Sequence, residues 1–487
     1  MTSLKQRFLS GVMWQAGVKM LSQGFSFLVS IMLARFILPE EYGLIGMAMV
    51  FTGFLNLINE IGIGSSIIRE PKVSDSALRS AYGFALAVSA VLCGLAQILA
   101  PAVAGFFDSE RVEPIIRVLA ISFFFGGMRA VPWSLLAKEM RFSVISKAEA
   151  LTVILGGITS LVLAVMGFGV WALVTGFMLQ QGLMALLANM LSPRKVLPSW
   201  RLGQALDLAS FGVKVMLIRV LWYTYSNADF FIIGKLLGDK LLGFYSLAFK
   251  IALLPTEKIT AIINPVCLPA FSELQNDTSS LAKYLSHLTM YLSIITFPVA
   301  FGIFAVADDF VLLFLTEQWL PIIIPLKLLS IIGLVRSIAI LFPPILLARN
   351  KTAFLVYYNI LLTIVMLAAF WIGASLHGIN GVAAGWAIAY PVVALTLMYA
   401  TCREIGLPLL RYAATLLPAT LGSLLMTAFI IALRRSSDCP LTWGFFLVEC
   451  SAGALCYAGF MILFQRRRFF ELRRALFKRP AQAGAAT

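Results

Sequence analysis

The feature that most constrains this chain is a succession of long apolar runs that continues almost from end to end. The hydrocarbon core of a bilayer is about 30 Å thick, and a helix needs roughly 20 apolar residues to cross it. These runs are continuous and do not alternate with polar residues, which favours helices over the strands of a membrane barrel. With 60% hydrophobic and 13% charged residues among 487, the sequence predicts an all-α polytopic membrane protein.

Fourteen transmembrane helices are predicted. They lie near residues 12–38, 42–66, 78–105, 114–137, 146–167, 169–192, 208–236, 241–271, 283–306, 321–347, 353–375, 378–402, 412–433 and 441–464. Short turns separate most of them, and no inserted soluble domain is expected. The predicted organisation is an N-terminal lobe of six spans, a C-terminal lobe of six spans, and two further spans with a basic tail, over residues 1–200, 201–403 and 404–487.

An internal similarity supports two related lobes. The turn Ala34–Ala48, ARFILPEEYGLIGMA, resembles Gly234–Ala248, GKLLGDKLLGFYSLA, at a constant offset of 200 positions, with Gly43 aligned to Gly243. Internal repeats separated by half a chain are typical of duplicated membrane transporters. We therefore expect two pseudo-symmetric six-helix lobes.

Basic residues in the loops predict the orientation. Alternate loops together with both termini carry 23 Lys and Arg, whereas the loops on the other side carry six. The positive-inside rule then places both termini in the cytoplasm, which requires an even number of spans. The tail QRRRFFELRRALFKR is expected to lie on anionic membrane lipid as a basic amphipathic helix, and nucleic acid is not an expected partner.

Nine Lys and Arg remain inside the predicted spans, against four carboxylates, Glu60, Asp229, Glu257 and Glu449. A charge at the centre of a membrane helix costs about 2.5–3.5 kcal/mol on insertion scales, so it normally faces a partner or water. The surplus of cations predicts a hydrated, positively charged cavity between the lobes, suited to an anionic substrate. The candidate cavity residues are Lys19, Arg129, Lys214, Arg219, Lys250 and Arg336.

Four of these cations form two pairs that are related by the repeat. Lys19 aligns with Arg219 at offset 200, and Arg129 aligns with Arg336 at offset 207. Glu60, Asp229 and Glu257 are candidate charge partners or sites for a coupling H+ or Na+, and no metal or other cofactor is expected. Simpler interpretations stay open: serines can serve helix packing, Arg117 and Lys327 can reach the interface, and Lys258 can pair with Glu257.

The segment Trp14–Glu70 resembles the start of Wzx-type polysaccharide flippases, in particular the colanic-acid-exporter-like members of the multidrug/oligosaccharidyl-lipid/polysaccharide exporter superfamily. The resemblance depends on the turn Leu33–Gly43, LARFILPEEYG, and on the run Glu60–Gly64, EIGIG. The resemblance implies transport of undecaprenyl-diphosphate-linked oligosaccharide from the cytoplasmic to the periplasmic leaflet by alternating access, for exopolysaccharide, capsule or O-antigen synthesis. It also implies location in a bacterial inner membrane, contact with membrane lipids and with other glycan-assembly proteins, and no enzymatic activity.

Other functions remain as alternatives. A lipid II flippase has the same number of spans and an equally anionic substrate, whereas a multidrug antiporter handles cationic compounds and fits the buried positive charge poorly. A polymerase or ligase of the same glycan pathway would carry a large outer loop and a catalytic cluster, and neither is evident here. A non-transporting scaffold would not need paired internal cations.

Overall fold

The structure, a computed structural model, describes residues 4–59, 63–70, 73–200, 203–437 and 440–477. Within these ranges, the side chains of residues 4–16, 203–219, 261–266 and 465–477, together with a few single positions, lie outside the description. The described residues form fifteen α-helices and one 3-10 helix, with no strand among them. The predicted all-α class is therefore confirmed.

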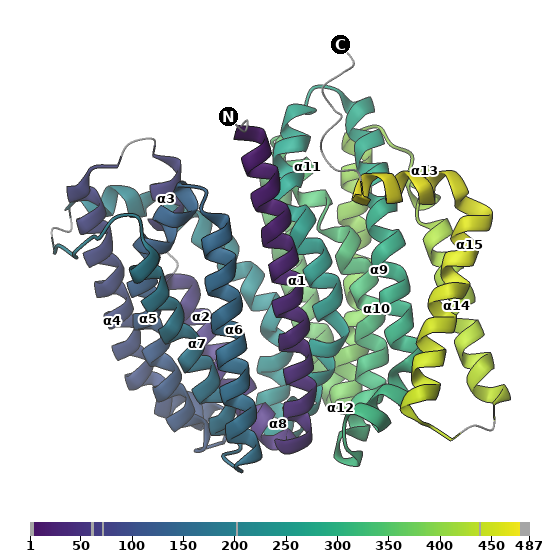
Figure 1. Cartoon of the computed structure of the whole chain (residues 1–487), viewed down its shortest axis with the longest axis horizontal. Coiled ribbons are helices and arrows are strands. Elements are labelled where there is room, and N and C mark those ends of the chain that lie inside the picture. Colours follow the sequence, from purple (N-terminus) through teal and green to yellow (C-terminus); the bar gives the residue numbers. More distant parts are fainter. Residues whose placement is uncertain (1–3, 60–62, 71–72, 201–202, 438–439, 478–487) are drawn as a thin grey trace. The chain divides into compact units, whose positions relative to one another are not determined.

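The chain divides into two compact units, Met1–Gly243 and Phe244–Thr487, called unit 1 and unit 2 below. The predicted lobe boundaries after residues 200 and 403 stay predictions. Each unit is a bundle of long helices with short connections (Figure 1). Unit 1 contains α1 (Leu4–Phe36), α2 (Pro39–Asn59), α3 (Ile63–Arg69), α4 (Asp75–Phe106), α5 (Val112–Lys138), α6 (Phe142–Val165), α7 (Val170–Leu191) and the first arm of α8 (Gly203–Glu273).

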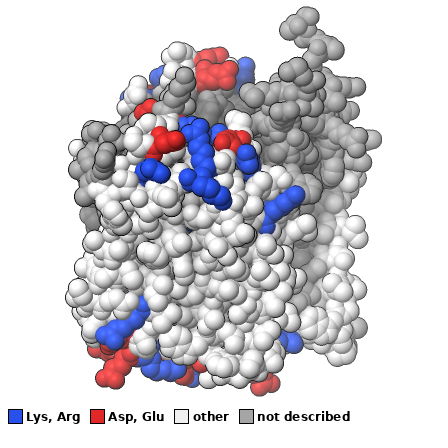
Figure 2. Space-filling view, turned by 60° about the vertical axis from the view of Figure 1, so that its left-hand side comes forward, with Lys and Arg blue, Asp and Glu red and all other residues white. Residues whose placement is uncertain are grey.

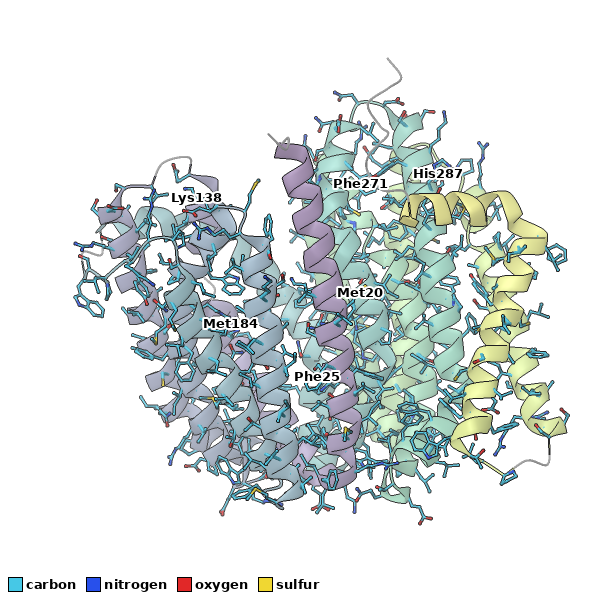
Figure 3. All side chains as sticks on the ribbon, viewed as in Figure 1. Met20, Phe25, Lys138, Met184, Phe271 and His287 are labelled. Atoms are coloured by element: carbon cyan, nitrogen blue, oxygen red, sulfur yellow. The ribbon has the colours of Figure 1, made fainter. Side chains whose placement is uncertain are left out.

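In unit 1, α5 is the central helix, because it packs against α2, α3, α4, α6 and α7. Helix α1 packs along α6, where Gly157 leaves room for Phe25 and Val29 (Figure 3). At one end of the bundle, Lys138 Nζ donates to the backbone carbonyls of Ile67 at 2.9 Å and Glu70 at 2.5 Å, which joins the end of α5 to α3 (Figure 3).

Unit 2 contains the second arm of α8 and the elements that follow it. These are α9 (Thr278–Phe314), the 3-10 helix η1 (Glu317–Ile322), α10 (Ile323–Ala339), α11 (Phe342–Ala348), α12 (Thr352–Glu404), α13 (Leu409–Ala413), α14 (Leu417–Ser436) and α15 (Trp443–Phe477). Helix α10 packs between α9 and α12, and the hairpin α14–α15 packs on α9. Near the start of α9, Phe271 of α8 contacts Tyr284 edge to face, with ring centroids 5.6 Å apart (Figure 3).

Eleven helices in the described ranges are long and apolar enough to cross a membrane. One of them, α12, covers two predicted spans, and α8, which is not among the eleven, covers two more. Helix α12 has 53 residues, which would extend about 80 Å as one rod, more than twice the thickness of a bilayer core. Backbone breaks at Gly378 (φ 57°) in α12 and at Gly238 (φ 82°) in α8 divide each helix into two arms. Positive φ values are accessible to glycine at little cost, so both breaks fall where the sequence permits a turn.

Most predicted spans agree with the observed helices to within about five residues, apart from local interruptions. Three helices are longer than predicted, because α1 begins at Leu4, α9 ends at Phe314 and α15 continues to Phe477. The predicted span 42–66 ends earlier, because α2 stops at Asn59 and the short α3 begins at Ile63. The predicted span 321–347 consists of η1, α10 and α11, with Pro321 in η1 and Pro343 and Pro344 at the start of α11. Proline lacks the backbone N–H that a continuous helix requires, which explains these interruptions.

The two repeat-related turns contact each other within unit 1, and the contact is reciprocal. A Cβ atom on Gly43 would overlap the carbonyl oxygen of Asp239, and a Cβ atom on Gly243 would overlap that of Pro39. Pro39 and Asp239 are themselves separated by the repeat offset of 200. Equivalent positions of the repeat therefore make equivalent contacts, and glycine is required at both because backbone meets backbone.

The distribution of charge on the surface agrees with membrane insertion. On the face shown in Figure 2, Lys, Arg, Asp and Glu gather mainly at the upper and lower edges, with a broad uncharged band between them. Large apolar side chains such as Val91, Ile98 and Val162 are more than half exposed. Lipid tails satisfy such side chains, whereas water would not.

Candidate functional site: charged side chains inside the helix bundles

Lys19 lies on α1 and meets a carboxylate of α6. Its Nζ atom is 3.5 Å from Glu149 Oε2, and both side chains remain partly accessible. The nearby serines of α1 are only partly available for such contacts, because Ser22 Oγ donates to the Lys19 carbonyl and Ser30 Oγ to the Ser26 carbonyl. These serines satisfy their hydroxyls within their own helix, which agrees with a packing role.

Sequence reasoning did not select Glu149. The sequence contains one signal for it, because Glu149 is the acidic residue of a predicted membrane span, α6. Its pairing with Lys19 depends on which faces of α1 and α6 meet, and this is decided by packing between helices that are far apart in sequence.

Arg129 lies on α5 and contacts α7. Its Nη1 atom donates to Gln181 Oε1 at 3.3 Å. The two glycines that precede it, Gly126 and Gly127, make room for polar side chains on α2 and α4, because a Cβ atom on either would collide with Asn59 or Ser89. The sequence GGMR thus places a cation beside a polar layer inside the bundle.

This polar layer is a hydrogen-bonded network of three helices. Asn59 Nδ2 donates to the Phe123 carbonyl at 3.1 Å, and Ser89 Oγ donates to Asn59 Oδ1 at 2.7 Å. Buried polar groups are costly unless they are paired, and here both Asn59 and Ser89 have partners. The network fixes α2 and α4 against α5 next to Arg129.

The remaining candidates of unit 1 are less informative. Asp229 is fully buried on the first arm of α8, and its Oδ1 accepts a hydrogen bond from the Phe230 backbone N–H at 3.0 Å. Nearby on the same arm, Tyr223 donates to the Val50 carbonyl of α2 at 2.9 Å. Glu60, and the side chains of Lys214 and Arg219, lie outside the described part of the structure.

Arg336 on α10 is the centre of the charged cluster in unit 2. Its Nη2 atom is 3.7 Å from Glu257 Oε1 on the second arm of α8. Its guanidinium carbon lies 5.3 Å from the ring centroid of Trp386 and 5.9 Å from that of Phe249, within the range of cation–π attraction. Its Nη1 atom is buried and has no hydrogen-bond partner among the described residues.

Two lysines follow these residues directly along α8. Lys250 comes after Phe249, and Lys258 comes after Glu257. The structure therefore pairs Glu257 with Arg336, whereas the sequence alone also permitted pairing with Lys258. Sequence reasoning missed Trp386 and Phe249. The one signal for Trp386 is a bulky aromatic in the run of small residues GVAAGWAIAY.

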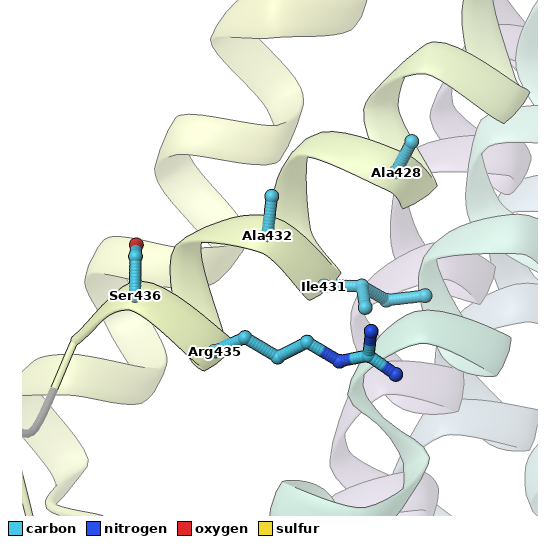
Figure 4. A pocket seen from close by; sticks show the side chains of 5 residues that line it. All are labelled: Ala428, Ile431, Ala432, Arg435 and Ser436. Atoms are coloured by element: carbon cyan, nitrogen blue, oxygen red, sulfur yellow. The ribbon is translucent and has the colours of Figure 1, made fainter.

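Two of the surface cavities in the described part of the structure contain none of the predicted site residues. A groove of about 540 Å³ runs along α14 and is lined by Ala428, Ile431, Ala432, Arg435 and Ser436 (Figure 4). A more polar cavity of about 620 Å³ lies where α4 begins and α7 ends, with Arg79, Arg194 and Lys195 among its lining residues. The predicted cavity between the lobes stays a prediction.

The side chains around Arg129 and those around Arg336 are better suited to bind anions than metal ions. In the described ranges, no group of three or more His, Cys, Asp or Glu is placed to hold a metal ion. Arg129 and Arg336 present planar guanidinium groups, which match the oxygen pairs of phosphates and carboxylates. An unpartnered guanidinium nitrogen on Arg336 leaves a donor available for such an oxygen.

Comparison with known proteins relates this architecture to glycan assembly. The chain is 27% identical to the lipopolysaccharide biosynthesis protein WzxC of Escherichia coli (strain K12), over 79% of this chain and 78% of that protein. It is 24% identical to the succinoglycan biosynthesis transport protein ExoT of Rhizobium meliloti (strain 1021), over 97% of each.

Among solved structures, the inward closed conformation of the lipid II flippase MurJ matches with a TM-score of 0.78 and 16% identity, covering 93% of this chain and 99% of that one. At this identity the likeness shows a shared membrane-transporter fold. The model of the family described as "Polysaccharide biosynthesis protein" matches residues 32–324, which is more than half of the chain. The chain therefore belongs to the polysaccharide biosynthesis protein family.

Proposed function

We propose that this protein is a flippase that moves undecaprenyl-diphosphate-linked oligosaccharide units from the cytoplasmic to the periplasmic leaflet of a bacterial inner membrane. The observation that carries the proposal is family membership combined with similarity along nearly the whole chain to a protein named as a biosynthesis transport protein. The product would supply exopolysaccharide, capsule or O-antigen synthesis, and alternating access would be the mechanism.

The charged clusters give this proposal a chemical basis. A lipid diphosphate carries concentrated negative charge, which is as costly in hydrocarbon as the buried cations themselves. Arg129 of unit 1 and Arg336 of unit 2 would each supply charge-assisted hydrogen bonds to its oxygens, and Lys19 would supply a third cation. Lys214, Arg219 and Lys250 remain further candidates, with Glu60, Asp229 and Glu257 as charge partners or as sites for a coupling H+ or Na+.

Carboxylates beside two of these cations would balance charge when substrate is absent. Glu149 lies by Lys19, and Glu257 lies by Arg336, at 3.5 and 3.7 Å. Such distances leave both ion pairs looser than an ideal hydrogen-bonded pair. Replacing each carboxylate with a phosphate oxygen of the substrate would therefore cost little free energy. Such an exchange favours reversible binding of the substrate.

Proteoliposomes provide a direct test. Purified protein is reconstituted with a fluorescent undecaprenyl-diphosphate-linked oligosaccharide, and an impermeant quencher added outside measures how fast the inner-leaflet lipid becomes accessible. We expect wild-type protein to accelerate exchange, and Arg129→Ala and Arg336→Ala to slow it. Arg117→Ala is the matched control, because Arg117 is also on α5 but forms an i,i+4 pair with Glu113 and is half exposed.

The results distinguish the competing functions. No acceleration by folded wild-type protein with any lipid-linked oligosaccharide would overturn the flippase proposal. Faster exchange of lipid II than of other lipid-linked oligosaccharides would instead support the alternative of a peptidoglycan precursor flippase. Polymerised product in the same vesicles would support the enzyme alternative.

A further inference from the structure

The hairpin α14–α15 buries one face of α15 that contains an acidic residue. This face includes Phe446, Glu449, Tyr457 and Met461, which recur at helical spacing and are buried. Tyr457 donates to the Ile294 carbonyl of α9 at 2.9 Å, and Gly453 lies against Ile430 of α14. Glu449 therefore points into the packing between three helices and not toward lipid.

Glu449 has no donor for its carboxyl group. Its exposed fraction is 0%, and neither side-chain oxygen has a hydrogen-bond partner among the described residues. Phe314 of α9 contacts Phe446 of α15, and the Ile294 carbonyl of α9 accepts from Tyr457, so the two helices run antiparallel and Asp309 lies level with Glu449. Asp309 is also nearly buried, with 8% exposed. Two ionised carboxylates are both acceptors, so they cannot hydrogen-bond each other unless one of them carries a proton.

Among the described side chains, Arg434 is close enough to balance part of this charge. Arg434 of α14 places its Nε atom 3.5 Å from Asp309 Oδ1, and its guanidinium lies over the Phe445 ring. The preceding acidic residue of α9, Asp308, is engaged by Lys327 of α10 at 2.5 Å. Two sequence neighbours of these residues lie elsewhere. Arg435 of α14 lines the groove that runs along α14 (Figure 4), and Cys450 of α15 is exposed.

The charges around Glu449 therefore do not cancel when both carboxyls are ionised. Asp309 and Glu449 contribute two negative charges, and Arg434 contributes one positive charge. A buried carboxylate without a partner is strongly disfavoured, and like-charged carboxylates that share a site raise each other's affinity for a proton. The cheapest way to neutralise the remaining charge is one proton on Glu449, because Arg434 already pairs with Asp309.

We infer that Glu449 holds a proton in the folded protein, at a site that joins α15 to α9, with the neighbouring Asp309 paired to Arg434. A proton fits this site better than a metal cation. Hard cations take several oxygen ligands, whereas this site provides two carboxyl groups and a guanidinium that repels a second cation. The inference concerns the packing of the C-terminal hairpin on α9 and does not depend on the proposed transport function.

The site has a consequence for stability that depends on pH. The folded protein holds a proton that the unfolded chain, with an ordinary Glu and Asp, has released at neutral pH. Since the folded state then binds more protons than the unfolded state, stability falls as pH rises through the range in which Glu449 loses its proton. The contribution is fully present at acidic pH and disappears under alkaline conditions.

Infrared spectroscopy of the purified full-length protein tests the inference. A protonated carboxyl has a C=O absorption distinct from that of a carboxylate, and titration between about pH 5 and pH 9 covers the range seen for buried acids. We expect a protonated-carboxyl band at neutral pH in the wild type, loss of that band in Glu449→Gln, and its retention in Glu317→Gln. Glu317 is the matched control, because it is an exposed glutamate of the same unit.

Two further measurements keep the result interpretable. Asp309→Asn should also remove the band, because Glu449 could then stay ionised beside Arg434, and this variant serves if Glu449→Gln does not fold. The melting temperature of the wild type should fall by a few degrees from acidic to alkaline pH, and that slope should flatten in Glu449→Gln, which mimics the protonated form.

Either of two outcomes overturns the inference. An identical neutral-pH band in wild type and folded Glu449→Gln would show that Glu449 is not the protonated group. Loss of the wild-type band when Na+ replaces a bulky organic cation, together with higher stability at alkaline pH, would show that the occupant is sodium instead of a proton.

Discussion

Arg336 shows at the scale of one residue how a buried cation can be stabilised without being neutralised. Two aromatic rings and a loosely placed Glu257 surround it, and Nη1 still lacks a partner among the described residues. Aromatic faces attract a guanidinium yet cannot accept a strong hydrogen bond from all of its donors. The surrounding residues therefore hold the Arg336 side chain in place, and its Nη1 atom can still donate a hydrogen bond to a ligand.

This environment predicts different effects for two substitutions. Arg336→Ala should lower the flipping rate in proteoliposomes about ten- to hundredfold, the range expected when a charge-assisted hydrogen bond to substrate is lost. Arg336→Lys should fall between Ala and wild type, because lysine keeps the charge but loses the planar fork and the stacking on Trp386. Full activity of Arg336→Lys would show that charge alone matters, and full activity of Arg336→Ala would contradict the site.

Substitutions of Lys19 and Glu149 can distinguish a substrate-binding role of Lys19 from a structural ion pair between the two residues. If Lys19 contacts substrate, Lys19→Ala should slow flipping while Glu149→Gln, which frees the lysine, should not. If the two residues form a structural pair, both substitutions should slow flipping through a common loss of stability. Because both side chains are partly exposed, we expect their coupling in thermal unfolding to stay below about 1 kcal/mol. Equal losses of activity would contradict a substrate role for Lys19.

At the scale of elements, the reciprocal contact between the two repeat-related turns makes a prediction about stability. Gly43→Ala and Gly243→Ala each place a methyl group against a backbone carbonyl that cannot move aside easily. We expect each to destabilise the protein by about 1–3 kcal/mol, the usual cost of overpacking, measured as a lower melting temperature in detergent. The double variant should cost less than the sum, because one displacement relieves both contacts.

Gly94→Ala is the control for this pair. Gly94 lies within α4, and a Cβ atom there would meet no other atom within 4 Å. Alanine is favoured over glycine inside a helix by up to about 1 kcal/mol, so this substitution should be neutral or stabilising. Destabilisation by Gly94→Ala equal to that by Gly43→Ala would mean that the glycines matter for a reason other than the contact between turns.

The positions of elements were largely predictable, because apolar runs, glycines and prolines act locally. The break at Gly238 falls between the predicted spans 208–236 and 241–271, and Gly378 begins the predicted span 378–402. The short helices α3, α11 and α13 were not predicted, since they are too brief for a periodic signal.

The partners of charged side chains were much less predictable. The pairs Lys19–Glu149, Arg336–Glu257 and Arg434–Asp309 each join helices that are distant in sequence or could rotate independently. Which residues meet depends on the rotation of each helix about its own axis, and tight packing sets this through many weak contacts. The sequence identified costly charges but not what each one contacts.

At the scale of the whole molecule, the remaining question is the direction in which the spans cross the membrane. The loops near Ser199 and Asn350 belong to the set rich in Lys and Arg, whereas those near Asp108 and Thr316 belong to the other set. If the positive-inside rule decides the orientation, Ser199 and Asn350 face the cytoplasm. Asp108 and Thr316 then face the periplasm. An even number of spans then places both chain ends in the cytoplasm.

Single cysteines in a cysteine-free background test this arrangement in intact cells. We expect an impermeant maleimide to label Asp108→Cys and Thr316→Cys directly, and to label Ser199→Cys and Asn350→Cys only after the inner membrane is permeabilised. Two positions come from each unit, so the units are tested independently. Labelling of all four in intact cells would indicate leakage, and the inverse pattern would contradict the orientation. Since the lipid diphosphate is expected to be loaded from the cytoplasm, an inverted orientation would also require the opposite direction of transport.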